Sequence, residues 1–357
     1  MSNLEQMLVE LDAIHGVSGD EERVAAYLKE QLTAHVDETY ADSLGNHFFV
    51  KKGSKPELKL MLCAHMDEIG FIVNYIDERG FVSFLPVGDH DSRMVINQVL
   101  AIQTERGVVH GITGGKPAHI VTEAEARQSI PLEDLFLDVG SRSREETLAL
   151  GVRAGDYITF SRTGQFLNGS KVYSGKSVDN RSGCAVMAEV MKRLADREIV
   201  PTVYAVAAVQ EEVGLRGAGV AAFSIQPDVA LAIDVGLAGG TPHIEEKTLP
   251  MVFGGGPGIL LFDWVPGTSA GNNVPKRLTR RLAQVAENSG IPHQQGAILN
   301  GVTDAYSISI AGKGTLTGCV CIPSRYIHSA TGYVHLDDME YTVQLIIAFI
   351  EAFQEKL

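Results

Sequence analysis

Histidine and carboxylate residues recur where predicted secondary-structure elements of this sequence end or begin. They are His65 after residues 58–64, Glu211 and Glu212 after residues 202–209, Asp234 after residues 229–233, His328 beyond residues 316–322, and Asp179 at the start of a predicted helix. Because the carboxyl ends of parallel strands line one edge of an open sheet, we expect these side chains to meet in one crevice. Imidazole nitrogens and carboxylate oxygens suit zinc, cobalt or manganese ions.

Each of these residues has an ordinary structural explanation when it is taken alone. A histidine at a strand end is more often a surface or core residue, the Glu211–Glu212 pair could form a solvated turn, and Asp179 could simply cap its helix. Their coincidence at one end of separate elements favours a metal site. Five ligands exceed the need of one tetrahedral ion with an open position, whereas two ions bridged by one carboxylate use all five.

A hydrolytic mechanism follows from this set of residues. A bridged pair of divalent ions makes a hydroxide available near neutral pH and polarises a scissile carbonyl. One member of the Glu211–Glu212 pair suffices as a ligand, which leaves its neighbour free to act as the general base. Asp67, two residues after His65, is well placed to hold the imidazole through its other ring nitrogen.

The elements that must position these residues indicate an α/β fold. Residues 1–35 predict a helix pair, with Ser18 and the two glutamates that follow it suited to a helix start. From residue 171 onward helices alternate with apolar strands, which is typical of a mostly parallel mixed sheet with helices on both faces. Between residues 69 and 165, short apolar runs separated by turn residues predict an inserted β-rich module. The catalytic α/β domain is then expected to comprise residues 1–68 and 166–357.

The composition restricts the expected partners and location. The 357 residues are 45% hydrophobic and 21% charged, which is ordinary for a globular protein of about two domains. The net charge is −14 and no basic run stands out, so nucleic acid and anionic membranes are not expected partners. The N-terminus lacks signal-peptide features, and no segment is apolar enough for a membrane helix, which predicts a cytoplasmic protein. The four cysteines lack paired Cys-x-x-Cys motifs and are interpreted as reduced core thiols.

Several motifs resemble those of the dinuclear metallo-aminopeptidases typified by glutamyl aminopeptidase and the tetrahedral (TET) aminopeptidases. They are Ala-His-Met-Asp-Glu-Ile-Gly at 64–70, Ser-Val-Asp-Asn-Arg at 177–181, Gln-Glu-Glu-Val-Gly at 210–214 and Arg-Tyr-Ile-His-Ser at 325–329. Gly-Gly-Lys-Pro at 114–117 and Leu-Glu-Asp-Leu-Phe at 132–136 extend the resemblance to the inserted module. The set is specific and spans nearly the whole chain, although any one motif alone is weak.

The resemblance implies a metal-dependent aminopeptidase, a protease that removes N-terminal residues from short peptides. It assigns Asp179 as the bridge between two divalent ions (zinc or cobalt, with manganese as a further option), His65 and Asp234 to one ion, and Glu212 and His328 to the other. Glu211 would be the general base, and Asp67 would orient a metal ligand. The resemblance also implies a zinc-peptidase-like catalytic domain, a PDZ-like or barrel module that mediates dimerisation, and homodimers that assemble into a homododecamer.

Two segments depart from the family pattern. Relatives tend to show Gly-Gly-Thr-Asp where this chain has Gly301-Val302-Thr303-Asp304, and residues 262–269 also look different. Both segments are expected near the pocket for the substrate side chain, so the specificity of relatives is not transferred.

Three alternatives to the aminopeptidase remain open at this stage. The first is another dinuclear-metal amidohydrolase, such as a deacylase or a carboxypeptidase-like enzyme. The second is a glycoside hydrolase, because relatives sometimes bear an endoglucanase name; its two carboxylates would need neither His65 nor His328. The third is a binding protein with a vestigial site, against which the full ligand set argues.

Two glycine-rich motifs are interpreted as structural. Residues 267–271 match Gly-x-Ser-x-Gly, but the flanking sequence lacks the strand before and the helix after that a nucleophile elbow requires. Residues 254–258 lack the Gly-Lys-Ser/Thr of a phosphate-binding loop and predict a tight turn.

Overall fold

A 12-stranded mixed sheet forms the centre of this computed structural model, which describes residues 1–357. Its middle consists of four adjacent strands in the order β12 (Pro201–Ala208), β3 (Lys55–His65), β13 (Val229–Leu237) and β17 (Leu316–Arg325). Each of these strands runs parallel to its neighbour. Their carboxyl ends therefore lie along one edge of the sheet, as the sequence predicts.

Antiparallel strands extend the sheet on both sides of this parallel centre. Beyond β12 lie β2 (His47–Lys51) and β1 (Glu38–Ala41), and beyond β17 lie β18 (Gly332–His335), β11 (Val172–Gly175) and β10 (Gln165–Phe166). A branch formed by β14 (Gly258–Trp264), β15 (Gly271–Asn273) and β16 (Gln294–Leu299) joins β17 through β14. The predicted mixed α/β fold is confirmed, with the parallel pairing concentrated at its centre.

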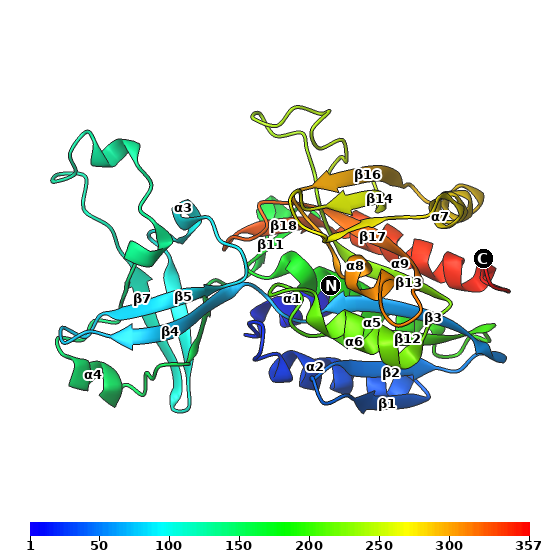
Figure 1. Ribbon diagram of the computed structural model, residues 1–357, viewed down its shortest axis with the longest axis horizontal. Helices are drawn as coiled ribbons and strands as arrows, with labels where there is room; N and C mark the ends of the chain where they lie inside the picture. Colours follow the sequence, from blue (N-terminus) through cyan, green and yellow to red (C-terminus); the bar gives the residue numbers. More distant parts are fainter.

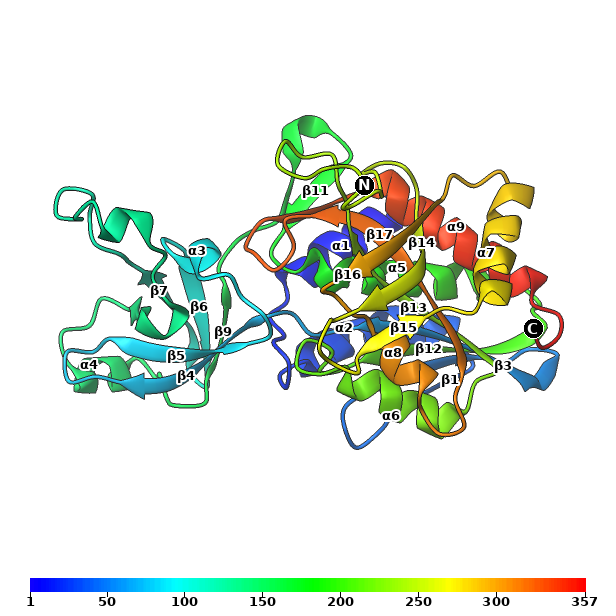
Figure 2. The same cartoon turned by 45° about the horizontal axis from the view of Figure 1, so that its top comes forward.

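Helices cover both faces of the sheet (Figures 1 and 2). Alternate residues of β3 point to opposite faces, so Leu60 and Leu62 belong to one hydrophobic cluster and Met61 and Cys63 to another. The first face packs against α1 (Asn3–Ala13), α2 (Glu22–Leu32), α5 (Val178–Leu194), α7 (Lys276–Asn288) and α9 (Leu336–Ala352). The second face packs against α6 (Arg216–Ile225) and α8 (Asp304–Ser309).

A closed barrel of six strands stands beside the α/β domain, at the left of Figure 1. Its strands are β4 (Gly70–Ile76), β5 (Val82–Val87), β6 (Val99–Thr104), β7 (Gly107–Thr113), β8 (Leu137–Asp138) and β9 (Tyr157–Phe160), and two short helices, α3 (Ser92–Val95) and α4 (Arg144–Ala149), accompany them. Phe71, Leu100 and Ile158 are among the residues of its separate hydrophobic core. The barrel lies inside the inserted segment expected from the sequence, and the predicted boundaries at 69 and 165 stay a prediction.

Several local expectations need correction or confirmation. Asp234 lies inside β13 instead of after it, because this strand pairs with β17 as far as Leu237. Ser18 does not cap α2, whose N-cap residue is Glu21.

All four cysteines are buried and free, as expected of core thiols. The Gly-x-Ser-x-Gly motif forms the connection between β14 and β15, so no helix follows it. No helix combines the length and the apolar character needed to cross a membrane.

Candidate metal centre

The structure brings together all five residues predicted as metal ligands. His65 is the last residue of β3, Glu212 follows β12, and Asp234 is in β13. Asp179 is the second residue of α5, where its backbone is still non-helical (φ −87°, ψ 106°), and the peptide bond that follows it is cis. His328 lies three residues beyond β17 with a left-handed backbone (φ 55°).

Two groups of potential ligands share Asp179. In the inner group, Nε2 of His65 lies 3.3 Å from Oδ1 of Asp179 and 3.6 Å from Oδ1 of Asp234. In the outer group, Nε2 of His328 lies 3.5 Å from Oδ2 of Asp179 and 3.5 Å from Oε2 of Glu212. Asp179 thus presents one oxygen to each histidine, which is the arrangement required of a bridging carboxylate.

The two histidines differ in their surroundings. The side chain of His65 is 2% exposed, and its Nδ1 lies 3.1 Å from the main-chain oxygen of Asp67 and 3.4 Å from Oδ1 of the same residue. The side chain of His328 is 33% exposed, and its Nδ1 lies 3.0 Å from the main-chain oxygen of Asp89. Asp89 belongs to the barrel segment between β5 and α3. The inner histidine is therefore oriented within the α/β domain, and the outer one is oriented by the inserted module.

The chemistry of the donor set fits divalent cations. Burial raises the pKa of Glu212 to about 8, and the negative charge of Asp179 adds to this effect. Burial also raises the pKa of Asp234. Carboxylates held together in a buried site repel one another, and bound cations relieve that repulsion. Each ligand group combines imidazole nitrogen with carboxylate oxygen, as zinc, cobalt and manganese sites do.

Glu211 is buried beside these ligands, and its carboxylate accepts no hydrogen bond from another group of the protein. Burial raises its pKa well above the usual range, and the charges of Glu212 and Asp304 add to the effect. His65, Glu211 and Glu212 also form a third group with ligand atoms within 4.8 Å of one another. Geometry alone thus leaves both glutamates within reach of a cation, and the contact of Glu212 with His328 favours Glu212 as the ligand.

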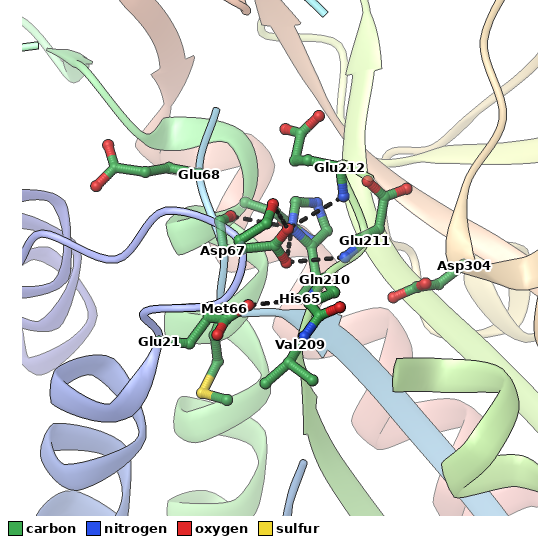
Figure 3. A network of polar contacts seen from close by, with 12 residues as sticks. Glu21, His65, Met66, Asp67, Glu68, Val209, Gln210, Glu211, Glu212 and Asp304 are labelled. Carbon is green, nitrogen blue, oxygen red and sulfur yellow. Dashed lines mark hydrogen bonds and ion pairs between the residues drawn. The ribbon is translucent and has the colours of Figure 1, made fainter. Parts of the chain in front are cut away.

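Asp67 contacts the backbone of the Glu211–Glu212 pair as well as the imidazole of His65. Figure 3 shows its carboxylate between His65 and the turn that follows β12. Its Oδ1 accepts a hydrogen bond from the main-chain N–H of Glu211 (3.0 Å) and its Oδ2 accepts one from Glu212 (3.1 Å). The hydroxyl of Ser18 donates a further bond to Oδ2 (2.6 Å). Asp67 is fully buried and therefore ties the end of β3 to the backbone of the glutamate pair.

Glu21 completes this arrangement, and sequence reasoning assigned it only to a helix start. Its Oε1 accepts hydrogen bonds from the N–H of Gly19 (2.9 Å) and from the N–H of Gln210 (3.0 Å). Gln210 has a left-handed backbone (φ 57°). Two buried carboxylates, Glu21 and Asp67, thus accept bonds from three consecutive N–H groups, those of residues 210, 211 and 212. No local sequence pattern marks these contacts, since Glu21 and Gln210 are 189 positions apart.

A buried ion-pair network supports the loop that carries Asp67. Nζ of Lys176 lies 2.6 Å from Oε1 of Glu68, and both side chains are almost completely buried. The fully buried guanidinium of Arg181 donates to the main-chain oxygens of Met66 (2.8 Å), Leu11 (2.7 Å) and Gly16 (3.2 Å). These bonds join α1, α5 and the end of β3. Because each charge is paired or hydrogen-bonded, the network can be buried beside the site.

One cavity of about 420 Å³ contains the candidate centre. Its polar side is formed by His65, Asp179, Glu211, Glu212, Asp234 and His328. The apolar residues of its lining, called the apolar wall below, are Leu215, Val235, Leu237, Val265, Ile298, Val302 and Ile327. Asp89, Gly214, Asn300, Gly301 and Thr303 complete the lining. Both segments that depart from the family pattern reach this cavity, through Val265 and through residues 301–303.

Known proteins share this fold and much of this sequence. The sequence model described as M42 glutamyl aminopeptidase matches residues 45–345. Lysyl aminopeptidase of Pyrococcus furiosus is 34% identical over 339 residues, which cover 94% of this chain and 93% of that protein. The structure of an aminopeptidase from the archaeon Desulfurococcus kamchatkensis has a TM-score of 0.92 at 36% identity, covering 97% of this chain and 94% of that one. The TET1 peptidase of Pyrococcus horikoshii, described as able to assemble into a tetrahedron or a large octahedral shell, has a TM-score of 0.84 at 31% identity, covering 97% and 99% of the two chains.

Proposed function

The chain belongs to the M42 glutamyl aminopeptidase family and is a peptide hydrolase, and from this premise we propose that it uses two divalent ions to remove N-terminal residues from short peptides. The observation that carries the proposal is the position of Asp179, whose two oxygens face the imidazoles of His65 and His328 at 3.3 and 3.5 Å. A single carboxylate shared by two histidine–carboxylate groups supports a dinuclear centre.

The ligand assignment follows the two groups. His65 and Asp234 would hold one ion, Glu212 and His328 the other, and Asp179 both. Zinc, cobalt and manganese all suit this set of nitrogen and oxygen donors. The bound ions supply the positive charge that polarises the scissile carbonyl and lowers the pKa of water.

Glu211 is the proposed general base. It would take a proton from the attacking water as the new C–O bond forms, and it would give that proton to the leaving amine as the C–N bond breaks. Two features of the site support this role. Its carboxylate is buried beside the proposed ligands, and its main-chain N–H is fixed by Asp67. Asp67 would act by positioning, since it contacts a histidine ligand and the backbone of both glutamates.

Assembly through the barrel is part of the proposal. The barrel exposes large apolar side chains, among them Leu85, Val108 and Ile112. Apolar surface that becomes buried between subunits favours association. The similarity to a peptidase that forms a tetrahedron or an octahedral shell supports a homodimer that assembles further, with a homododecamer as the expected form. A cytoplasmic location stays a prediction.

Hydrolysis of a panel of free-amine aminoacyl anilides, with N-acetylated controls, tests the proposed activity. We expect cleavage of free-amine substrates only, loss of cleavage with a chelator, and recovery on addition of zinc, cobalt or manganese. Cleavage of the acetylated controls would instead point to another amidohydrolase. Chelator-resistant cleavage of a β-glucan would point to a glycoside hydrolase, whose chemistry needs two carboxylates and no metal.

A further inference from the structure

The cavity that holds the candidate centre is also lined by the seven residues of the apolar wall. We propose that this enzyme prefers peptides whose first residue has an uncharged, apolar side chain, which the apolar wall receives. This inference rests on the proposed function and adds to it the class of substrate. The description of the family as glutamyl aminopeptidases and the name of the lysyl aminopeptidase relative both refer to charged first residues.

An acidic first side chain finds no cationic side chain in this cavity. The 18 lining residues include neither lysine nor arginine. The two lining histidines face carboxylates through Nε2 and main-chain oxygens through Nδ1, so neither has a free nitrogen for the substrate. A substrate carboxylate would therefore lose its hydration without gaining an ion pair from the lining side chains.

Arg216, whose side chain lies beside the lining residue Gly214, donates to Oε1 of Gln210 (3.1 Å), and two further arginines are also engaged. Arg325 donates to the main-chain oxygen of Gly239 through Nη2 (2.6 Å) and lies over the ring of Phe253. Arg181 is fully buried and bound to main-chain oxygens, as described above. Neither Arg325 nor Arg181 can turn into the cavity without breaking these contacts.

A basic first side chain finds one weak partner. Asp89 is the only carboxylate of the lining outside the polar side, and it is exposed. An ion pair with an exposed carboxylate is screened by water and contributes little to binding. The remaining polar groups are limited, because the hydroxyl of Thr303 already donates to Oδ2 of Asp263 at 3.1 Å.

An apolar side chain, by contrast, meets apolar residues of the lining. Seven apolar residues line the cavity, and Ile298 and Val235 among them are buried. Moving an apolar group from water against such a surface is favourable in proportion to the area covered. The apolar wall therefore favours apolar side chains, whose transfer from water is favourable. It disfavours charged and polar side chains, which would lose hydration without gaining a partner.

The test is a comparison of kcat/KM for leucyl, glutamyl and lysyl anilides with the metal-loaded, full-length enzyme. We expect the leucyl substrate to exceed both charged substrates by about 100-fold, the order of discrimination that a hydrophobic pocket achieves. A glutamyl or lysyl value equal to or above the leucyl value would overturn the inference and leave the aminopeptidase intact. If no free-amine substrate is cleaved, the proposed function itself fails.

A charge placed in the wall provides a second test. In Val302→Lys the new ammonium group should raise the ratio of glutamyl to leucyl kcat/KM at least tenfold. Val252→Lys is the matched control, since Val252 is 59% exposed and lies outside the cavity, and the ratio should stay unchanged. Val265→Lys places the charge elsewhere in the wall and replaces Val302→Lys if that variant does not fold. An unchanged ratio in a folded wall variant would contradict the assignment of this surface to the substrate side chain.

Discussion

The polar side of the cavity and the part of the apolar wall formed by the branch of β14, β15 and β16 are built from different kinds of structure. The polar side takes most of its residues from the ends of central strands and the start of α5, and buried carboxylates fix its backbone. Three of the seven residues of the apolar wall, Val265, Ile298 and Val302, come from β16 and from loops after β14 and β16, a branch whose strand β14 forms two residue pairs with β17. The other four lie in β13 or after β12 and β17, close to the proposed ligands. Changes in the branch can therefore alter the specificity while the strand ends stay in place.

Removing the shared carboxylate should have the largest effect on the polar side. We expect Asp179→Ala to lose metal from both positions and to have no detectable turnover, since both ligand groups contain this residue. Metal content per chain, measured after dialysis by mass spectrometry, checks this directly. Full occupancy of both positions in a folded variant would exclude Asp179 as the bridge.

The next largest effect is expected from variants that distinguish the metal ligand from the general base within the Glu211–Glu212 pair. Glu211→Gln should lower kcat by about 10²- to 10⁴-fold, the usual contribution of general acid–base catalysis, while both metals stay bound. Glu212→Gln is its matched control at the adjacent position, and it should lose metal from the outer group, which includes His328. If Glu211→Gln is the variant that loses metal, the two roles must be exchanged, which the third ligand group would allow.

A smaller effect on kcat is expected from changing Glu21, which supports the polar side from a distant position in the sequence. Glu21→Ala removes the acceptor for the N–H of Gln210, and the resulting shift of the glutamate turn should lower kcat roughly tenfold, since small misplacements of catalytic groups are costly. KM and metal content should stay unchanged. Glu21→Gln keeps an oxygen acceptor and should restore most of kcat.

Glu22→Ala is the control for Glu21→Ala because Glu22 is the exposed neighbour in the same helix. It should leave kcat unaltered. An equal loss of kcat in both variants, or a loss of metal in Glu21→Ala, would show that the helix start matters for stability and that Glu21 does not position the base.

Sequence alone predicts the polar side well because its signals are local. His65 and the Glu211–Glu212 pair each follow an apolar strand, and parallel strands must end at a common edge. The contacts of Glu21 and Asp67 with the glutamate turn could not be predicted, since they join positions 189 and 144 apart. The contact of His328 with Asp89 spans 239 positions and two domains. The extent of β13 was also missed, because its pairing with β17 continues past the carboxylate of Asp234.

The apolar wall could be anticipated only as a departure from a pattern. Gly301-Val302 and residues 262–269 look unlike the family, but the strands β14 and β16 that bring them together were not predicted. The burial of β14 does not follow a simple alternation, since Gly258, Ile259 and Leu260 are all buried, whereas β16 alternates with Leu299 exposed. Their register, in which Trp264 pairs with Leu299, sets Val265 and the residues after Leu299 on the same cavity. A specificity surface of this kind depends on tertiary pairing more than on local sequence.

The smallest predicted effect tests whether the two sides are independent. Val302→Ala removes two methyl groups from a half-exposed position of the wall. We expect KM for the leucyl anilide to rise roughly threefold, well below the 10-fold or greater effect of a methylene in an enclosed pocket, with kcat and metal content unchanged. The same variant should leave the KM of an alanyl anilide nearly constant, because a methyl side chain covers little of the wall. A fall in kcat for both substrates would instead show that the wall helps to place the scissile bond, and the two sides of the cavity would then act together.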